Sequence, residues 1–413
     1  ESIMANIGKS LMGWVDARFP ATETYEYHMS KYYAPKNFNF WYFFGVLSMI
    51  VLVNQLVTGI WLTMSYNPSG EGAYDSIEYI MRDVEYGWLL RYMHSTGASA
   101  FFVVIYLHMF RGLLYGSYKK PRELVWLFGM AIYLALMAEG FFGYLLPWGN
   151  MSYWGAQVIL NLAGAVPLVG DELVTWVRGD YLISGITLNR FFALHVVAIP
   201  LVLVALVFMH LVALHHVGSN NPDGVDIKKV KDENGIPLDG IPFHPYYTVH
   251  DLVGIVVFLA IFSAVIFFFP DGGGYFLEKP NFEPANPLKT PPHIAPVWYY
   301  TPYYAILRAV PSKLGGVIAM GAAIAILFVL PWLDKSPVKS MRYKGTQSKI
   351  WLTLFVISFL GLGYLGAVPS DPVKTVISQV LTIIYFLFFL LMPFYTSMET
   401  VKTVPDRVTG GAH

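Results

Sequence analysis

The sequence predicts an all-α integral membrane protein with eight transmembrane helices, of which the first four form a bundle. Hydrophobic residues make up 55% of the 413 positions, charged residues only 13%, and the mean hydropathy is +0.50. This composition is typical of membrane proteins rather than soluble enzymes. Eight apolar stretches have about the 20 residues needed to cross a hydrocarbon layer. Two of them each carry a pair of histidines at nearly the same interval.

The predicted spans lie near residues 40–64, 88–115, 124–146, 188–214, 249–269, 313–333, 350–368 and 374–396. An even number of spans places both termini on one side of the membrane. The loops on that side carry most of the lysine and arginine residues, so the positive-inside rule predicts that both termini are cytoplasmic. Residues 1–37 lack the compact apolar core of a signal peptide, and we expect an amphipathic surface helix over 3–19.

Charge and cysteine content exclude several classes of function. The net charge is zero, so nothing favours binding to nucleic acid. The absence of cysteine excludes disulfides, thiolate ligation of haem and cysteine-held iron–sulfur clusters in this chain. A redox cofactor here must therefore be held by histidine or methionine.

The histidine pairs indicate such a cofactor. His94 and His108 are 14 residues apart, which is about 40° short of four full turns and a rise of roughly 21 Å, so both rings leave one face at two levels. His195 and His210 offer a second pair on another span. Two facing imidazoles at each level can bind a haem iron from both axial sides inside a helix bundle. A single histidine could equally be a hydrogen-bonded core residue or a proton relay, but four in register favour two b-type haems.

Four glycines repeat the interval of the histidines. Gly45 and Gly59 in the first span, and Gly129 and Gly143 in the third, are each 14 residues apart. Glycine lets a backbone approach a flat group closely, although ordinary helix packing is the alternative for any one of them. The chain then divides into a surface segment (1–37), a di-haem four-helix bundle (38–216), an inner loop (217–248) and a C-terminal four-helix domain (249–413) with a long loop at 270–312.

The second histidine pair has a different spacing from the first, because His195 and His210 are 15 residues apart. An ideal helix would swing the second ring by about +60° rather than −40°. Pro200 lies between the two ligands and lacks a backbone N–H. We therefore predict an irregular turn near 196–204 that absorbs the extra residue.

Five motifs together resemble cytochrome b of the cytochrome bc1 complex, the ubiquinol–cytochrome c oxidoreductase or respiratory complex III, of bacterial type. They are Arg91-Tyr92-Met93-His94, His108 with Arg111, Gly143-Tyr144-Leu145-Leu146-Pro147-Trp148-Gly149, Ser219-Asn220-Asn221-Pro222 and Pro296-Val297-Trp298-Tyr299. The resemblance covers nearly the whole chain. It implies a multi-pass protein of the bacterial inner (plasma) membrane in a homodimeric complex, with the Rieske iron–sulfur protein, cytochrome c1 and membrane lipids as partners.

The resemblance also implies a Q cycle. Ubiquinol would be oxidised at an outer site, and electrons would pass through a low-potential haem (His94, His195) and a high-potential haem (His108, His210) to ubiquinone at an inner site, with protons translocated. Three arginines would pair with haem propionates: Arg91, Arg111 and Arg190.

The same resemblance assigns the two quinone sites. The outer one would be lined by Tyr144, Met151, Gly155, Pro296, Tyr299 and Tyr304, below the docked Rieske protein. The loop 270–312 is rich in proline and aromatic residues, which suits a preset wall, although an ordinary surface loop is the alternative. The inner site would use His215, Ser219 and Asp251; as the alternative, Asp251 caps the fifth span.

This chain departs from the family at Val297, where the family motif has a glutamate credited with taking a proton from quinol. Glu139 is the carboxylate well inside a span, four residues from Gly143. We predict that Glu139 receives the proton instead, through water and Tyr144; a neutral structural acid is the alternative.

Two other classes of protein are distinguishable from this reading. A multi-span transporter would not need paired histidines with paired glycines and would show no b-type spectrum. A haem-bearing anchor of another dehydrogenase should lack the Pro-Val-Trp-Tyr segment and the long outer loop.

Overall fold

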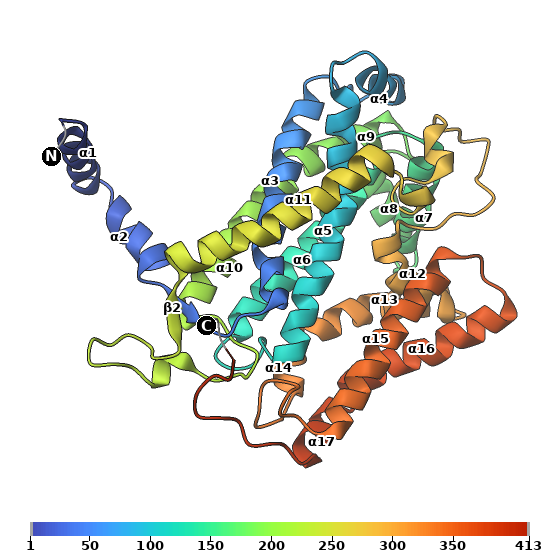
Figure 1. Ribbon diagram of the computed structural model, residues 1–413. Helices are drawn as coiled ribbons and strands as arrows, with labels where there is room; N and C mark the ends of the chain where they lie inside the picture. The colour runs from blue at the N-terminus through green and yellow to red at the C-terminus, as the bar shows by residue number, and fades with distance from the viewer. Residues whose placement is uncertain (1–2, 411–413) are drawn as a thin grey trace.

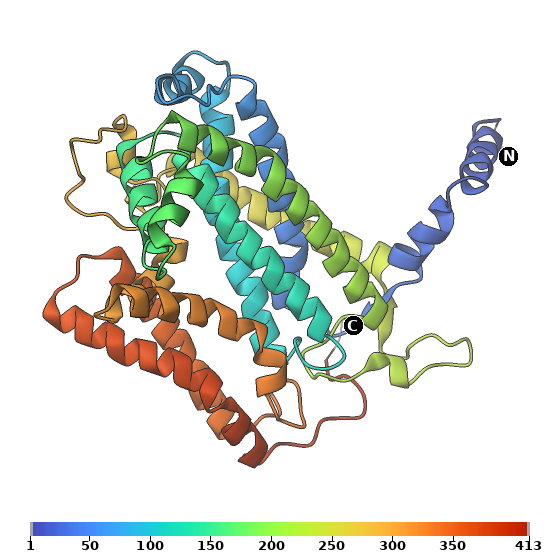
Figure 2. The ribbon, with the colours of Figure 1, turned by 180° about the vertical axis from the view of Figure 1, so that it is seen from behind.

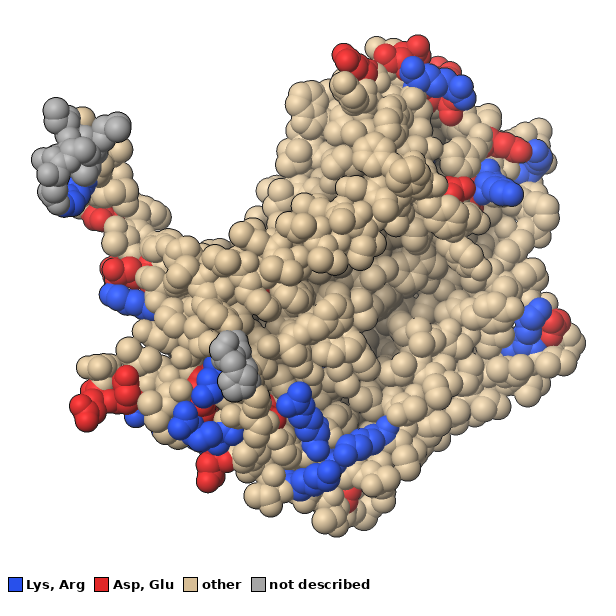
Figure 3. Space-filling view, viewed as in Figure 1, with Lys and Arg blue, Asp and Glu red and all other residues tan. Residues whose placement is uncertain are grey.

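The protein is mostly helical, and its long helices lie side by side. The structure, a computed structural model, describes residues 3–410 (Figures 1 and 2). On the face shown in Figure 3, charged side chains gather toward the two ends of the molecule, with a broad uncharged belt between them. This distribution fits a protein whose middle lies in a membrane.

Seven helical segments of the described chain are long and apolar enough to cross a membrane. They are Phe40–Thr63 (with α3, Phe43–Thr63), Gly87–Tyr115 (α5), Glu123–Leu145 (α6), Gly185–Val217 (α9, Gly185–Ala193, and α10, Ile199–Val217), Phe243–Phe268 (with α11, Thr248–Phe268), Thr346–Ala367 (α15) and Pro372–Leu390 (α16). The described chain is mostly helical, and these seven candidate spans agree with seven of the eight predicted ones.

The predicted span 313–333 is shorter than expected. The helix α13, Lys313–Phe328, has 16 residues and ends before Val329, and the single turn α14, Leu330–Leu333, follows. Pro331 lies in the first turn of α14 and cannot donate the hydrogen bond that would continue α13. The count of eight spans is therefore not confirmed by helix length.

The shorter elements join these helices. They are α1 (Ile3–Asp16), α2 (Ala21–Tyr25), α4 (Ala73–Arg82), α7 (Asn150–Ala163), α8 (Gly170–Arg178), α12 (Thr301–Ala309), α17 (Met392–Met398), β1 (Tyr33–Pro35) and β2 (Gly240–Pro242). The strands pair antiparallel, with Ala34 opposite Ile241. Because Tyr32 and Ala34 are buried, the end of the N-terminal segment is packed into the protein rather than lying on its surface.

The helices pack in two groups. In the first, α3 packs against α5, and α6 packs against α10. In the second, α12, α15 and α16 pack against one another. The largest buried apolar cluster joins the groups and includes Phe102 of α5, Tyr133 of α6, Leu362 of α15 and Phe389 of α16.

The predicted irregular turn is present between α9 and α10. Residues Leu194–Ala198 form one turn of π-helix, in which Ile199 N–H bonds Leu194 O, and Pro200 follows in the first turn of α10. A π turn holds one more residue than an α turn. It thereby absorbs the fifteenth residue between His195 and His210, about two residues earlier than predicted.

Two buried aspartates hold the C-terminal tail against the inner loop. Asp239 accepts two hydrogen bonds from Arg407, both 2.7 Å long, and Asp223 accepts one from Thr409 N–H at 2.7 Å. The bonds from Arg407 lower the pKa of Asp239 to about 2. Because this pKa is lowered, the carboxylate contributes its full stabilisation above the unfolded pKa of about 3.9 and loses it as the pH falls toward 2.

We predict that Asp239→Asn frees the tail at neutral pH. The loss of charge-assisted hydrogen bonds costs about 1–2 kcal/mol, which corresponds to a roughly 5- to 30-fold rise in opening. Limited trypsin digestion, followed by mass spectrometry, should show faster cleavage after Arg407. Asp406→Asn, an exposed neighbour in the same tail, is the control and should leave the cleavage rate unchanged.

Candidate functional site

Four histidines face one another in two pairs within the first group of helices. His94 of α5 faces His195 of the π turn, with ring centroids 6.1 Å apart and ring planes at 90°. One level further along α5, His108 faces His210 of α10 at 6.5 Å and 63°. The structure therefore brings together the four histidines in the pairs that the sequence predicts.

Each predicted glycine lies against one of these rings. A Cβ atom built on Gly59 would lie 3.0 Å from His94 Cε1, and one on Gly143 would lie 2.4 Å from His195 Cε1. At the other level, Gly45 faces His108 at 3.6 Å, and Gly129 faces His210 at 3.3 Å. The glycines of α3 thus back the rings of α5, and the glycines of α6 back the rings of the α9–α10 segment.

Hydrogen bonds to Nδ1 orient the rings of His94 and His195. Thr58 Oγ1 lies 3.0 Å from His94 Nδ1 and donates its own proton to Asn54 O, so Nδ1–H of His94 is the donor. His195 Nδ1 lies 2.9 Å from Glu139 O and 3.0 Å from Glu139 Oε1. When Nδ1 carries the proton, Nε2 is left as a neutral ligand atom.

Of the three predicted arginines, Arg91 is buried and Arg111 is half-buried. Arg91 is 7% exposed and borders a cavity of about 310 Å³ together with Pro147 and Asn281. Within residues 3–410, the buried Nε of Arg111 has no hydrogen-bond partner. A buried guanidinium is costly without an anion, so both positions suit a negatively charged group. Arg190 differs, because it is exposed and donates to Trp176 O at 2.6 Å.

The long loop 270–312 returns beside the Leu146–Trp154 segment. Gly149 pairs with Pro284, and Asn150 N–H bonds Glu283 O at 2.9 Å. Asn281 Oδ1 accepts a bond of 2.8 Å from Ser152 N–H. The loop is therefore attached to the start of α7 rather than free on the surface.

Most residues predicted for an outer site lie near this attachment. Tyr144, at the end of α6, donates to Glu278 Oε2 at 2.6 Å, and its ring lies next to Gly155 of α7. Met151 and Tyr299 are buried, and the ring of Tyr299 stacks on Phe102 at 3.9 Å. For the other two predicted residues, Pro296 is half-buried and Tyr304 lies under the guanidinium of Arg308 at 4.6 Å.

The carboxyl groups near this region differ from the prediction. The Glu139 side chain reaches His195, and its Oε2 is buried with no hydrogen-bond partner among residues 3–410. It is Glu278 of the loop that meets the Tyr144 hydroxyl. Val297 is 4% exposed and offers no polar atom on its side chain. The role of Glu139 as proton acceptor stays a prediction. Glu278 is a second candidate for that role.

At the opposite end, His215 and Ser219 meet at Tyr32. The rings of His215 and Tyr32 lie 4.3 Å apart, and Tyr32 Oη lies 2.8 Å from Ser219 Oγ. Asp251 lies in the first turn of α11, and the described residues give it no hydrogen bond to His215 or Ser219. The N-cap of α11 is Tyr247, so Asp251 does not cap this helix. A carboxylate in the first turn still interacts favourably with the positive end of the helix dipole.

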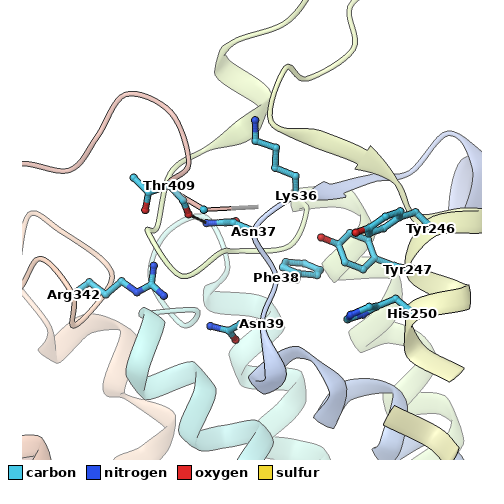
Figure 4. A pocket seen from close by; sticks show the side chains of 10 residues that line it. Lys36, Asn37, Phe38, Asn39, Tyr246, Tyr247, His250, Arg342 and Thr409 are labelled. Atoms are coloured by element: carbon cyan, nitrogen blue, oxygen red, sulfur yellow. Dashed lines mark hydrogen bonds between the residues drawn. The ribbon is translucent and has the colours of Figure 1, made fainter. Parts of the chain in front are cut away.

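A cavity of about 550 Å³ opens near this inner region. Figure 4 shows Phe38, Tyr247 and His250 on one side of it, and Arg342 and Thr409 on the other. His250, the residue before Asp251, thus borders the cavity. His215, Ser219 and Asp251 do not belong to its lining.

Comparisons with known proteins agree with this geometry. Residues 29–218 match the family model described as cytochrome b/b6/petB, and residues 284–386 match cytochrome b (C-terminal)/b6/petD. The chain is 63% identical to cytochrome b of Allochromatium vinosum, over 96% of this chain and 98% of that protein. It is 50% identical to cytochrome b of Rhodospirillum rubrum, over 96% and 95%. The chain belongs to the cytochrome b family.

A solved structure supports the same assignment. A chain of a hyperthermophilic respiratory complex III superposes with a TM-score of 0.86 at 39% identity, over 94% of this chain and 99% of that chain. The family resemblance predicted from the sequence is confirmed, and the fold is that of cytochrome b.

Three residues of the candidate site were not predicted. Thr58 bonds a histidine from a neighbouring helix, Tyr32 comes from the N-terminal segment, and Glu278 comes from the outer loop. For Thr58 there was a usable signal, because it directly precedes Gly59. Tyr32 and Glu278 lie outside any repeating pattern.

Proposed function

We propose that this chain is the quinol-oxidising, electron-transferring cytochrome b subunit of a bc1 complex, the quinol–cytochrome c reductase of a bacterial respiratory chain. The most direct support is that four imidazoles face one another in two pairs, at two levels of the helices. The ring centroids are 6.1 Å apart in one pair and 6.5 Å apart in the other. Membership of the cytochrome b family and the likeness to a respiratory complex III support the same function.

The spacing of the rings fits two bis-histidine haems. A metal–imidazole bond is about 2 Å long, and each ring adds roughly 1 Å, so two rings on one iron have centroids about 6 Å apart. Among residues 3–410, no group of three or more His, Asp or Glu residues is placed to hold a metal ion. A porphyrin would supply the remaining four ligands of each iron.

His94 and His195 would hold the low-potential haem near the outer surface, and His108 and His210 the high-potential haem near the inner one. When bound, these haems supply one-electron transfer across the membrane. Arg91 and Arg111 would pair with propionates, which gives a counter-charge to two buried guanidinium groups. Arg190 keeps this role as a proposal, although its guanidinium must leave Trp176 O to take it.

The outer site would bind ubiquinol between α6, α7 and the loop 270–312. Tyr144, Met151, Gly155, Pro296, Tyr299 and Tyr304 would line it, with a Rieske iron–sulfur protein docked above. Its wall is preset, because the loop is bonded to α7 and Tyr299 is stacked on Phe102. A fixed apolar wall lowers the entropy cost of binding a quinone ring.

The inner site would bind ubiquinone near His215, Ser219 and Asp251. The contacts of His215 and Ser219 with Tyr32 support a shared pocket. His215 and Asp251 would hydrogen-bond the two carbonyl oxygens of the quinone and donate protons to them.

The assembly would follow the family pattern. We place the chain in the bacterial inner membrane, with both termini cytoplasmic, α13 and α14 together making an eighth crossing, and lipids around the spans. Cytochrome c1 and a second copy of the complex would complete the partners. Purified protein should show two b-type components in a reduced-minus-oxidised spectrum and two one-electron steps in a redox titration; a single haem would contradict the proposal.

We predict that Gly143→Ala removes the outer haem. The new Cβ would lie 2.4 Å from His195 Cε1, so the ring must leave its position. Gly45→Ala is the matched change at the other level, where 3.6 Å is an ordinary contact, and it should keep both haems. Haem content per chain should fall by about half in the first variant only. Gly321→Ala, which meets no atom within 4 Å, controls for the helix substitution itself.

We also predict that Asp251→Asn slows reduction of quinone at the inner site by about 10- to 100-fold, because a proton donor is lost. After a pulse of quinol, the inner haem should stay reduced for longer, while the first electron transfer from the outer site keeps its rate. Equal reoxidation rates in the variant and the native protein would exclude Asp251 from this role.

A further inference from the structure

Tyr144 and Glu278 form a fixed pair at the outer site. The Tyr144 hydroxyl donates to Glu278 Oε2 at 2.6 Å. Ser152 Oγ holds the backbone of Tyr144 through a bond of 2.5 Å to its carbonyl oxygen. Glu278 in turn precedes the helical turn Lys279–Phe282, which Asn281 attaches to Ser152 N–H. Both partners are therefore positioned by the same residue at the start of α7.

The surroundings of Glu278 suit an acceptor of protons at neutral pH. Its side chain is half-buried, and the titratable groups that face it are Tyr144 of α6 and Tyr299 of the 298–300 turn. Burial raises the pKa of Glu278 to about 7, against the opposing effect of the Tyr144 hydrogen bond. The next residue in the chain, Lys279, is exposed, so the loop reaches the protein surface directly after Glu278.

We infer that Glu278 accepts, through Tyr144, one of the two protons that quinol releases at the outer site. In this chain it would replace the carboxylate that Val297 cannot supply. The inference rests on the proposed function. It names a positioning and proton-accepting residue behind Tyr144 rather than a group that touches quinol.

In this step one proton of quinol would reach Glu278 by way of Tyr144. The quinol O–H bond breaks and its proton moves to Tyr144 Oη, while the original Tyr144 proton moves to Glu278 Oε2. Glu278 becomes a neutral carboxylic acid and then releases its proton to the outer water. The second quinol proton would pass to water at the site, and the two electrons would leave to the Rieske cluster and to the haem that His94 and His195 would hold, as the proposed function requires.

Glu139 is less suited to this step. Its Oε1 lies 3.0 Å from His195 Nδ1, so its contact is with a proposed haem ligand. The hydroxyl proton of Tyr144 points to Glu278. The two carboxyl groups therefore belong to different neighbours, and amide substitutions can separate their effects.

The test compares Glu278→Gln, Glu139→Gln and Glu283→Gln in the purified complex. Turnover of quinol with cytochrome c is measured from pH 5 to 9, with haem spectra of each variant. Only the carboxylate form accepts a proton, so native turnover should rise with pH through about 7. Glu278→Gln should lose this rise and lower turnover by about 100-fold, with both haems in place. Glu283→Gln, an exposed change in the same loop, should keep native behaviour.

Two results would overturn the inference: native turnover with the pH rise retained in Glu278→Gln, or loss of the rise in Glu139→Gln alone. If Glu278→Gln fails to keep its haems, Tyr144→Phe decides, because it removes the same hydrogen bond without changing charge. Native turnover in Tyr144→Phe would refute the relay, and loss of the pH rise would support it. A native complex with two haems but no quinol turnover would overturn the proposed function and this inference together.

Discussion

The structure depends on one constraint: four imidazoles must be held in the protein interior as two facing pairs. A buried polar ring without partners is costly, and among residues 3–410 the Nδ1 atoms of His108 and His210 have no hydrogen-bond partner. Thr58 is hydrogen-bonded to His94, and the backbone of Glu139 is hydrogen-bonded to His195. The glycines of α3 and α6 let the helices approach closely enough to support the rings from behind.

The same constraint explains the irregular helix between α9 and α10. With 15 residues between His195 and His210, a regular α-helix would point one ring away from its partner. The π turn at Leu194–Ala198 restores the direction, and both centroid distances then agree to within half an ångström. A local defect in hydrogen bonding is tolerated because it preserves a pairing that the bundle requires.

Much of the fold and of this bundle could be predicted because helix periodicity converts sequence spacing into depth and direction. That conversion gives seven spans, both imidazole pairs, four glycines and the π turn. It fails where regular structure ends. Hydropathy over 313–333 is continuous, but Pro331 divides the segment, and Tyr32 was assigned to a surface region although β1 pairs with β2 and buries it. Glu278 lies 134 positions from Tyr144, in a loop whose path no spacing rule describes.

Glu139 and Glu278 contact different groups in this cytochrome b. Glu139 contacts His195, the proposed haem ligand, whereas Glu278 contacts Tyr144 of the proposed outer site. If one group served both, a proton leaving the site would change the charge next to the ligand at the moment of electron transfer. Placing Glu278 on the loop and Glu139 on α6 separates these effects in space. On the inferred route the proton would enter at Tyr144 rather than at position 297, and Val297 would then be compatible with quinol oxidation.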